Sequence, residues 1–240
     1  MFENQSTKAN FLLGLFMGMA AVSVLAFFAL LIAVFSQGQS VSLVDEAGAN
    51  APVADNAAAA NDAPAAVTPV PAVSADDYFV GNKNAKVTMI IYTDFECPFC
   101  LKHAEVTKAL KDKYGDKIKM VIRNFPLSFH AQAQKAAEAY ECAGEQGKAW
   151  QMNESLFAAN SAKTMSVDTW KSEAKKLGLD TKKFNTCLDS GKYAEKITKQ
   201  QEAGSAAGVE GTPATFINGV LLSGAMPQAT YETEIDALLK

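Results

Sequence analysis

The sequence has no excess of positive charge, few cysteines and few histidines, and each scarcity excludes a class of function. It has 22 lysines and arginines against 26 aspartates and glutamates, for a net charge of −4, so nothing predicts a nucleic-acid partner. Four cysteines are too few for a small domain stapled by disulfides, but they fit a protein that uses thiols selectively. Two isolated histidines, His103 and His130, do not make a metal site, and we expect neither metal nor cofactor.

Charge is absent from residues 11–35, which are dense in Phe, Leu, Ala and Val. A helix of this length exceeds the roughly 30 Å of a bilayer's hydrocarbon core at about 1.5 Å per residue. A cleaved signal peptide is the alternative, but its apolar region would run only about 7–15 residues, and Val34-Phe35-Ser36 is a weak cleavage site. Lys8 precedes the run and no Lys or Arg follows before Lys83. We therefore expect residues 1–35 to be a short cytoplasmic N-terminus with an uncleaved signal anchor, a single-pass transmembrane span, and the rest to be exported.

Aromatic residues and positive charges are both absent from residues 36–76, which are rich in alanine and contain four prolines. Such a composition cannot bury enough apolar surface to offset the conformational entropy lost on folding. We expect a disordered linker here. As a flexible coil it would let a domain that begins at Asp77 reach about 35 Å from the membrane.

Residues 77–240 begin with an α/β pattern. Val87–Tyr92 is continuously apolar and β-prone, as expected of a central strand that is covered on both faces. A helical pattern follows and ends at Gly115, and Lys119–Arg123 predicts a second strand. Strand, helix and strand in this order predict a parallel pair.

The second half of this region changes character. From about residue 128 to 207 no strand pattern appears, and apolar residues recur at helical spacing, which predicts an inserted helical block. Thr215–Leu222 then predicts a hairpin around Asn218-Gly219. Tyr231–Leu239 predicts a closing amphipathic helix.

Cys97-Pro98-Phe99-Cys100 stands where the first strand gives way to its helix. A thiol attacks a disulfide only as the thiolate, and a helix N-terminus lowers a thiol's pKa because its unpaired N–H groups and dipole favour an anion. Pro98 can take the first helical position, where its missing N–H costs nothing. We predict Cys97 to be an exposed nucleophile and Cys100, one turn further in, to be the resolving thiol.

Cys142 and Cys187 are 45 positions apart in the helical block. In an oxidising compartment we expect a structural disulfide between them, nominally worth about 2–4 kcal/mol. A second redox pair that relays electrons to Cys97 and Cys100 is the alternative, but neither cysteine has a CxxC neighbour or an activating cation beside it. A zinc site built from all four cysteines lacks the usual second close pair, and inert core cysteines at Cys97 and Cys100 are the other alternative.

The segment Asp94–Cys100 together with Gly211-Thr212-Pro213 and the helical block between them resembles the DsbA-like thiol:disulfide oxidoreductases of the thioredoxin superfamily. The resemblance covers roughly residues 77–240. It implies a fold of the α/β class, a thioredoxin-like fold with an inserted helical block.

The resemblance also implies the layout of the site. Pro213 would follow a cis peptide bond and pack beside the redox pair, and the backbone of Thr212 would pair with a substrate strand lying across Cys97. Pro98 and Phe99, between the cysteines, and Thr212 would tune the redox potential.

Two positions depart from the family pattern. The strong oxidants of the family carry a histidine before the resolving cysteine, where this chain has Phe99, and many relatives carry a carboxylate six residues before the nucleophile, where Ile91 stands. The nearest acids are Asp94, which we expect to shape the turn or helix start, and Glu96, which we expect to face solvent at the rim. We expect His103 on the outer part of the helix.

The implied activity is thiol-disulfide exchange with exported proteins. In the oxidase direction a substrate thiolate attacks the Cys97–Cys100 disulfide at Cys97, and a second substrate thiol resolves the mixed disulfide. The reduced enzyme is then reoxidised by a membrane redox partner, in this family usually a quinone-linked protein. We expect the domain on the periplasmic side of a bacterial cytoplasmic (inner) membrane. An isomerase or reductase with the same site is the first alternative, and a non-catalytic metal- or client-binding module is the second.

Overall fold

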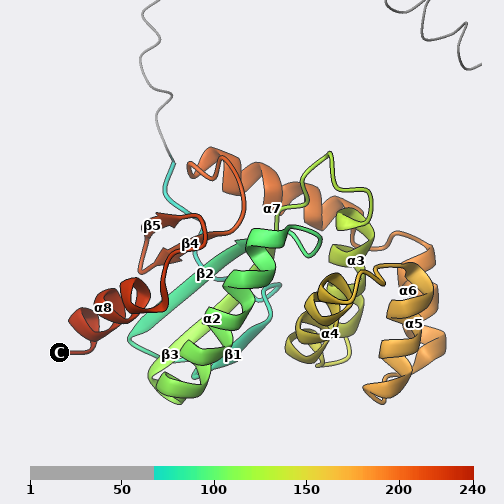
Figure 1. Cartoon of the computed structure of the whole chain (residues 1–240), viewed down its shortest axis with the longest axis horizontal. Coiled ribbons are helices and arrows are strands. Elements are labelled where there is room, and N and C mark those ends of the chain that lie inside the picture. Colours follow the sequence, from blue (N-terminus) through green and yellow to red (C-terminus); the bar gives the residue numbers. More distant parts are fainter. Residues whose placement is uncertain (1–67) are drawn as a thin grey trace, which may run out of the picture. The chain divides into compact units, whose positions relative to one another are not determined.

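The computed structural model describes residues 68–240 (Figure 1). The predicted span at residues 11–35 and most of the predicted linker lie outside this part of the chain. Within residues 68–240, no helix combines the length and the apolar character needed to cross a bilayer.

A five-stranded sheet forms the frame of the domain, with the strands in the order β1-β3-β2-β4-β5. The strands β2 and β3 are parallel, as predicted, and the other neighbouring pairs are antiparallel. Every predicted strand is present to within a residue or two at its ends, whereas the three-residue strand β1 was not predicted. The strands are β1 (Phe79–Gly81), β2 (Val87–Thr93), β3 (Ile118–Asn124), β4 (Ala214–Ile217) and β5 (Val220–Ser223).

Strand β2 is central, and helices cover both of its faces. On one face Met89 and Ile91 pack with residues of α2 (Pro98–Tyr114) and α8 (Gln228–Leu239). On the other face Tyr92 meets α7 (Ala194–Ala206), where a Cβ atom at Gly204 would lie 2.7 Å from the tyrosine ring. The burial of both faces explains why β2 reads as a continuous apolar run rather than an alternating one.

The predicted helical block is confirmed as an insert between β3 and β4 (Figure 1). Its core includes the fully buried Trp170 and Tyr140, and it extends to Phe95, whose ring centroid lies 5.6 Å from that of Tyr140 and 5.2 Å from that of Phe157. The loop of residues 94–97, which joins β2 to α2 and which we call the redox loop, is therefore packed against the insert as well as against the sheet. The insert comprises α3 (Ala133–Gly144), α4 (Ala149–Ser161), α5 (Val167–Lys176), α6 (Thr181–Asp189) and α7.

Residues 68–76, which their composition assigned to the linker, instead contact the domain. Thr68 donates its backbone N–H and its hydroxyl to the carbonyl of Ala206 at the end of α7. The guanidinium of Arg123 donates to the carbonyls of Pro71 and Ala72 and to both carboxylate oxygens of Asp77. The ordered domain therefore begins at least nine residues before Asp77. The composition did not reveal this because backbone carbonyls, which every residue carries, make most of these contacts.

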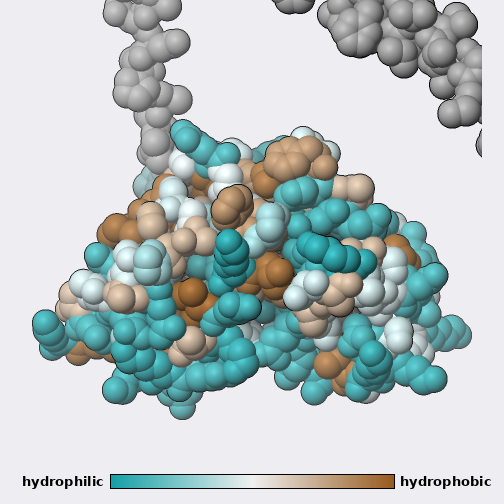
Figure 2. All heavy atoms as spheres, in the orientation of Figure 1, coloured by the Kyte–Doolittle hydropathy of each residue, from teal (hydrophilic) through white to brown (hydrophobic). Residues whose placement is uncertain are grey.

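In Figure 2 hydrophilic residues dominate the lower edge of the domain, and hydrophobic residues lie in the middle, over α2, and also along the upper part. The large apolar side chains that are most exposed include Phe99, 59% exposed, and Phe129, 76% exposed. Phe99 belongs to the cysteine motif itself. Phe79 on β1, Val220 on β5 and Met226 are exposed as well, so the exposed apolar side chains lie both at the cysteine motif and on the edge strands of the sheet.

Candidate active site

Cys97 is the N-cap residue of α2, and Pro98 occupies the first helical position as predicted. The backbone of Cys97 is extended, with φ −69° and ψ 127°, and its carbonyl accepts the first helical hydrogen bond, from the N–H of Leu101. Its own N–H donates to the carbonyl of Asp94 at 3.2 Å. The nucleophile is therefore held at the positive end of a 17-residue helix.

Both thiols of the motif are free, and their environments separate their pKa values. The hydrogen bond from the Cys100 thiol lowers the pKa of Cys97 to about 5, and the backbone N–H groups of Cys100 and Phe99 add to this effect against the opposing effect of burial. Burial, followed by the hydrogen bond to Cys97, raises the pKa of Cys100 above its ordinary value. At neutral pH the reduced pair is a thiolate at Cys97 and a thiol at Cys100.

The predicted exposure of Cys97 is wrong. The residue is 4% exposed and Cys100 is 1% exposed. The reason is a second segment that covers the motif: the carbonyl of Thr212 lies 3.6 Å from the Cys97 sulfur, and the Thr212–Pro213 peptide bond is cis. The exposed part of the motif consists of Pro98 and Phe99.

Asp94 has the structural role expected of it. Its buried carboxylate accepts hydrogen bonds from the N–H of Glu96 at 2.7 Å, from the N–H of Leu127 at 2.8 Å and from Nδ1 of His130 at 2.8 Å. The last two partners belong to the segment between β3 and α3. Asp94 thereby fixes the redox loop to the start of the helical insert.

Glu96 differs from its predicted role as a solvent-facing rim residue. It is half-buried, and its carboxylate accepts a hydrogen bond from the N–H of Gln132, the N-cap residue of α3. The distant partner explains the difference, because nothing near Glu96 in the sequence indicates that a helix 36 positions away begins beside it.

His103 also differs from prediction, being 2% exposed rather than on the outer part of α2. Its Nε2 lies 3.3 Å from the hydroxyl of Thr215 on β4, and its ring centroid lies 5.3 Å from that of Tyr231 on α8. The sequence contained a signal for this position. His103 falls at helical spacing between Cys100 and Thr107, on the stripe that α2 buries.

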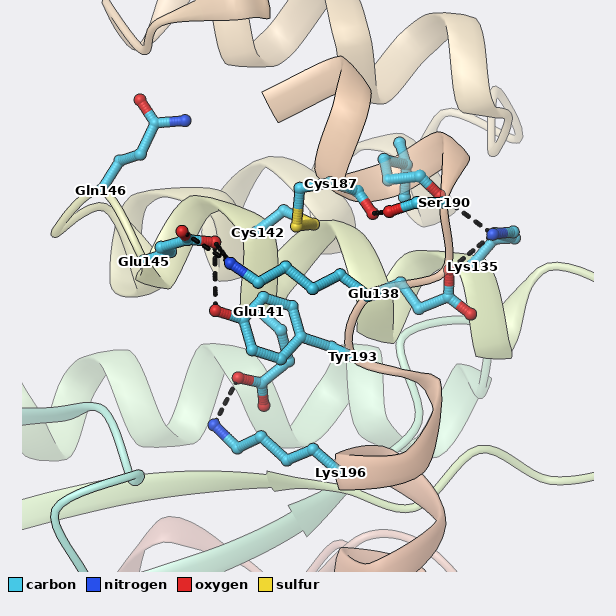
Figure 3. The surroundings of a disulfide bond; sticks show 12 residues. Lys135, Glu138, Glu141, Cys142, Glu145, Gln146, Cys187, Ser190, Tyr193 and Lys196 are labelled. Carbon is cyan, nitrogen blue, oxygen red and sulfur yellow. Dashed lines mark hydrogen bonds and ion pairs between the residues drawn. A yellow bond between two sulfur atoms is a disulfide. The ribbon is translucent and has the colours of Figure 1, made fainter. Parts of the chain in front are cut away.

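Cys142 and Cys187 are joined in a disulfide that links α3 to α6 (Figure 3). Ion pairs and hydrogen bonds surround it, among them Lys196 with Glu141 and Lys135 with Glu138. Because their sulfurs are bonded to each other, these cysteines are not available to complete a zinc site with Cys97 and Cys100. In the part of the chain that the structure describes, no three His, Cys, Asp or Glu side chains are placed to hold a metal ion.

The sequence and the fold of this chain are both similar to those of known proteins. A family model described as thioredoxin matches residues 73–237, more than half of the chain. The solved structure of α-DsbA1 from Wolbachia pipientis is similar with a TM-score of 0.61 at 24% identity, covering 70% of this chain and 92% of that one. The thiol-disulfide exchange protein α-DsbA2 of the same organism has a TM-score of 0.59 at 25% identity, covering 69% and 88%. A periplasmic thioredoxin-like protein from Salmonella enterica serovar Typhimurium has a TM-score of 0.56 at 24% identity, covering 68% and 90%.

The similar curated sequences are longer proteins. A Na(+)/H(+) antiporter, NhaA 3 of Salinispora tropica, is 35% identical over 144 residues, which are 60% of this chain and 22% of the antiporter. Another, NhaA 1 of Mycolicibacterium vanbaalenii, is 31% identical over 164 residues, which are 67% of this chain and 26% of that protein. The chain spans about a quarter of the length of these relatives.

Proposed function

The chain belongs to the thioredoxin family as a DsbA-like thiol-disulfide oxidoreductase, and we propose that it oxidises thiols of exported proteins through the Cys97–Cys100 disulfide. The observation that carries this direction is the opposite shift of the two pKa values, lowered at Cys97 and raised at Cys100. A thiolate that is stabilised in the reduced form makes the disulfide form a stronger oxidant. The hydrogen bonds to the Cys97 sulfur therefore favour accepting electrons from a substrate.

In the proposed reaction a substrate thiolate attacks the sulfur of Cys97 in the disulfide. The bond to Cys100 breaks, Cys100 takes up a proton, and a mixed disulfide joins the substrate to Cys97. A second substrate thiolate then attacks the substrate sulfur, and Cys97 leaves as a thiolate of low pKa. The product is a substrate disulfide, and the enzyme has gained two electrons and one proton.

The substrate contacts follow from the surface around the sulfur. The exposed ring of Phe99 offers an apolar contact, and the segment at Thr212 and Pro213 lies against Cys97. We propose that a substrate strand lies along this segment. Pro98, Phe99 and Thr212 are then the residues that set both the contact with the substrate and the reduction potential.

We propose that the domain works on the periplasmic side of a bacterial cytoplasmic membrane, tethered by residues 11–35. The apolar run and the distribution of Lys and Arg support this position, as does the similarity to a protein described as periplasmic. The reduced enzyme then needs a membrane redox partner to reoxidise it, because the reaction leaves both electrons on Cys97 and Cys100.

The deciding experiment is the reduction potential of the Cys97–Cys100 couple, measured by equilibration of the protein with glutathione buffers. A value close to the about −120 mV of DsbA supports the oxidase. A value close to the about −270 mV of thioredoxin overturns it in favour of the reductase or isomerase alternative.

The non-catalytic alternative needs a separate measurement, because a binding module can also carry a redox couple. Oxidation of a reduced model protein is compared between the wild type and Cys97→Ser. Equal turnover in the two proteins would overturn the enzymatic assignment, and metal titration of the reduced wild type would then test the metal-binding module.

A further inference from the structure

A small cavity, lined by both polar and apolar side chains, lies behind Cys100, on the side of α2 that faces the sheet and the insert. Its volume is about 10 Å³, close to the minimum of about 10–15 Å³ that a single water needs. Its polar lining consists of Cys100, His103, Thr93, Thr107 and Asn153, all of them buried. The side-chain oxygen of Asn153 is buried and has no hydrogen-bond partner among the described residues. The cavity thus offers the two to four polar partners that a bridging water requires.

Cys100 has a proton to exchange but little access to solvent. The residue is 1% exposed, and burial raises the pKa of its thiol. Nevertheless the thiol must lose its proton when the ring closes to the Cys97–Cys100 disulfide, and must regain it when the ring opens. An internal group that accepts and returns this proton would remove the need for direct contact with solvent.

His103 is the one other titratable side chain among the residues that line the cavity. The groups that face its ring from neighbouring elements are neutral: the hydroxyl of Thr215 on β4, and Tyr231 on α8, whose pKa is raised by burial. The nearest carboxylate of the redox loop, Asp94, is directed to His130 and to two backbone N–H groups instead.

The His103 ring is available as a proton acceptor, although burial weakens it as a base. Burial lowers its pKa to about 4, so that at neutral pH the imidazole is uncharged and one of its two nitrogens carries a free lone pair. The contact of Nε2 with Thr215 holds the ring in place. The ring is therefore fixed, neutral and beside the same cavity as the thiol.

We propose that His103 is the internal base of the redox site, relaying the proton of Cys100 through this cavity to the leaving thiolate or to solvent as the disulfide closes, and relaying a proton back to Cys100 as the disulfide opens. In the closing step the Cys100 sulfur attacks the Cys97 sulfur of a mixed disulfide, the bond from Cys97 to the partner breaks, and the partner leaves as a thiolate. The proton moves from Cys100 to His103 and then to the leaving thiolate or to solvent. This inference rests on the proposed exchange at Cys97 and Cys100.

The test uses reduced protein and glutathione disulfide, with the reaction quenched by acid and the species separated by mass. The first step, formation of the Cys97–glutathione mixed disulfide, reports the proposed function. The second step, ring closure with release of glutathione, reports the internal base. His103→Gln keeps a hydrogen-bonding side chain towards Thr215 but cannot take up a proton, and we expect it to slow ring closure by about 10²-fold while the first step is unchanged.

The pH dependence separates a proton acceptor from a packing residue. In the wild type we expect ring closure to be independent of pH between about 6 and 8, because the neutral base is fully available there. In His103→Gln we expect the rate to rise about tenfold per pH unit, because hydroxide must remove the proton. Thr107→Ser is the matched control: it changes the same cavity wall, keeps the hydroxyl that lines it, and removes no base.

Two results would overturn the assignment of His103. One is ring closure in His103→Gln at the wild-type rate, and the other is a slowed rate with the wild-type independence of pH. If His103→Gln does not fold, the pH dependence of ring closure in the wild type is the test. A rate that rises tenfold per pH unit would show that hydroxide, and not His103, is the base. Failure of the first step in the wild type would instead refute the proposed function.

Discussion

The two cysteine pairs of this protein occupy opposite ends of their helices. Cys97 caps the N-terminus of α2, with Cys100 in its first turn, whereas Cys142 and Cys187 each lie two residues before the last residue of α3 and α6. The N-terminal end of a helix dipole stabilises a thiolate and the C-terminal end disfavours it. Because thiolates drive disulfide exchange, the same bond is suited to opening at the first site and to persistence at the second.

The two pairs also differ in what their chain separation means for stability. Cys97 and Cys100 close a ring of four residues, which constrains the unfolded chain little. Cys142 and Cys187 are separated by 45 positions, so their bond constrains a long loop. Function and stability are thus divided between the pairs, and substitutions can test that division.

The largest effect is expected for Cys97→Ser. We expect turnover with a reduced model protein to fall by at least about 10³-fold, because without Cys97 the motif cannot form the disulfide that the substrate thiolate attacks. The loss is measured by the rate at which substrate disulfide forms. Cys100→Ser is the companion variant: it also lacks the motif disulfide, but its Cys97 thiolate should attack glutathione disulfide, and the mixed disulfide should accumulate because no resolving thiol is present. Loss of mixed-disulfide formation in that variant as well would contradict the assigned order of the two cysteines.

The next effect is expected from removing the other pair. The double variant Cys142→Ala, Cys187→Ala should lower the free energy of unfolding by about 2–4 kcal/mol, because the unfolded chain gains the entropy of an unconstrained loop. Urea denaturation measures this change. Turnover should stay close to that of the wild type. A loss of turnover that exceeds the loss of folded protein would contradict the purely structural role of Cys142 and Cys187. It would favour an electron relay between the two pairs.

A pH series sharpens the contrast at Cys97. Because the pKa of its thiol is lowered to about 5, alkylation of the reduced protein by iodoacetamide should be nearly constant from about pH 6 to 8. Below pH 5 the rate should fall about tenfold per pH unit as the thiolate is protonated. The denatured protein is the control, and its thiols should titrate near pH 8.5. A folded-state midpoint near 8.5 would contradict the lowered pKa.

The same shift predicts how the stability of the reduced form depends on pH. The folded pKa of Cys97 lies below its unfolded value of about 8.5, so its stabilising contribution is complete above pH 8.5 and is lost as pH falls towards 5. Cys100, whose folded pKa is raised, stays protonated in the folded state across this window, and its ionisation in the unfolded state near pH 8.5 is common to the wild type and to Cys97→Ser. Relative to Cys97→Ser, the free energy of unfolding of the reduced wild type should rise between pH 5 and 8.5. Urea denaturation of both proteins measures this difference. A difference that does not change with pH would contradict the prediction.

The smallest effect is expected for Glu96→Gln, which tests whether the redox loop depends on the helical insert. The amide keeps an acceptor for the N–H of Gln132 but loses its charge, so we expect a loss of about 0.5–1.5 kcal/mol in the free energy of unfolding. Glu105→Gln, at an exposed position of α2, is the matched control and should change stability less. Equal effects of the two substitutions would show that the contact with Gln132 contributes nothing.

The sequence predicted the parts of this protein whose signals are local. The apolar run of β2, the Asn218-Gly219 turn and the CxxC motif with its proline at the helix start each appear within a few residues, and each is present in the structure. It missed features that depend on distant partners. Strand β1 has only three residues, too few for a periodic pattern in the sequence, and it forms by pairing with its neighbour β3, about 40 residues later in the chain.

The errors at the site have the same cause. The burial of Cys97 comes from Thr212, more than 100 positions later in the chain, and the role of Glu96 comes from the start of α3. His103 is the exception, since its place on the buried stripe of α2 follows from helical spacing alone.

The clasp of Arg123 on Asp77, Pro71 and Ala72 has a mechanical consequence. The chain enters the domain through this clasp, whose two charged side chains are almost fully buried, at 6% and 4% exposed. A force applied at residue 68 would load the hydrogen bonds of Thr68 to Ala206 at the end of α7 first, and then the bonds of Arg123 on β3. Neither α7 nor β3 contains the cysteine motif. The contacts by which this segment holds the domain therefore do not load the start of α2 directly.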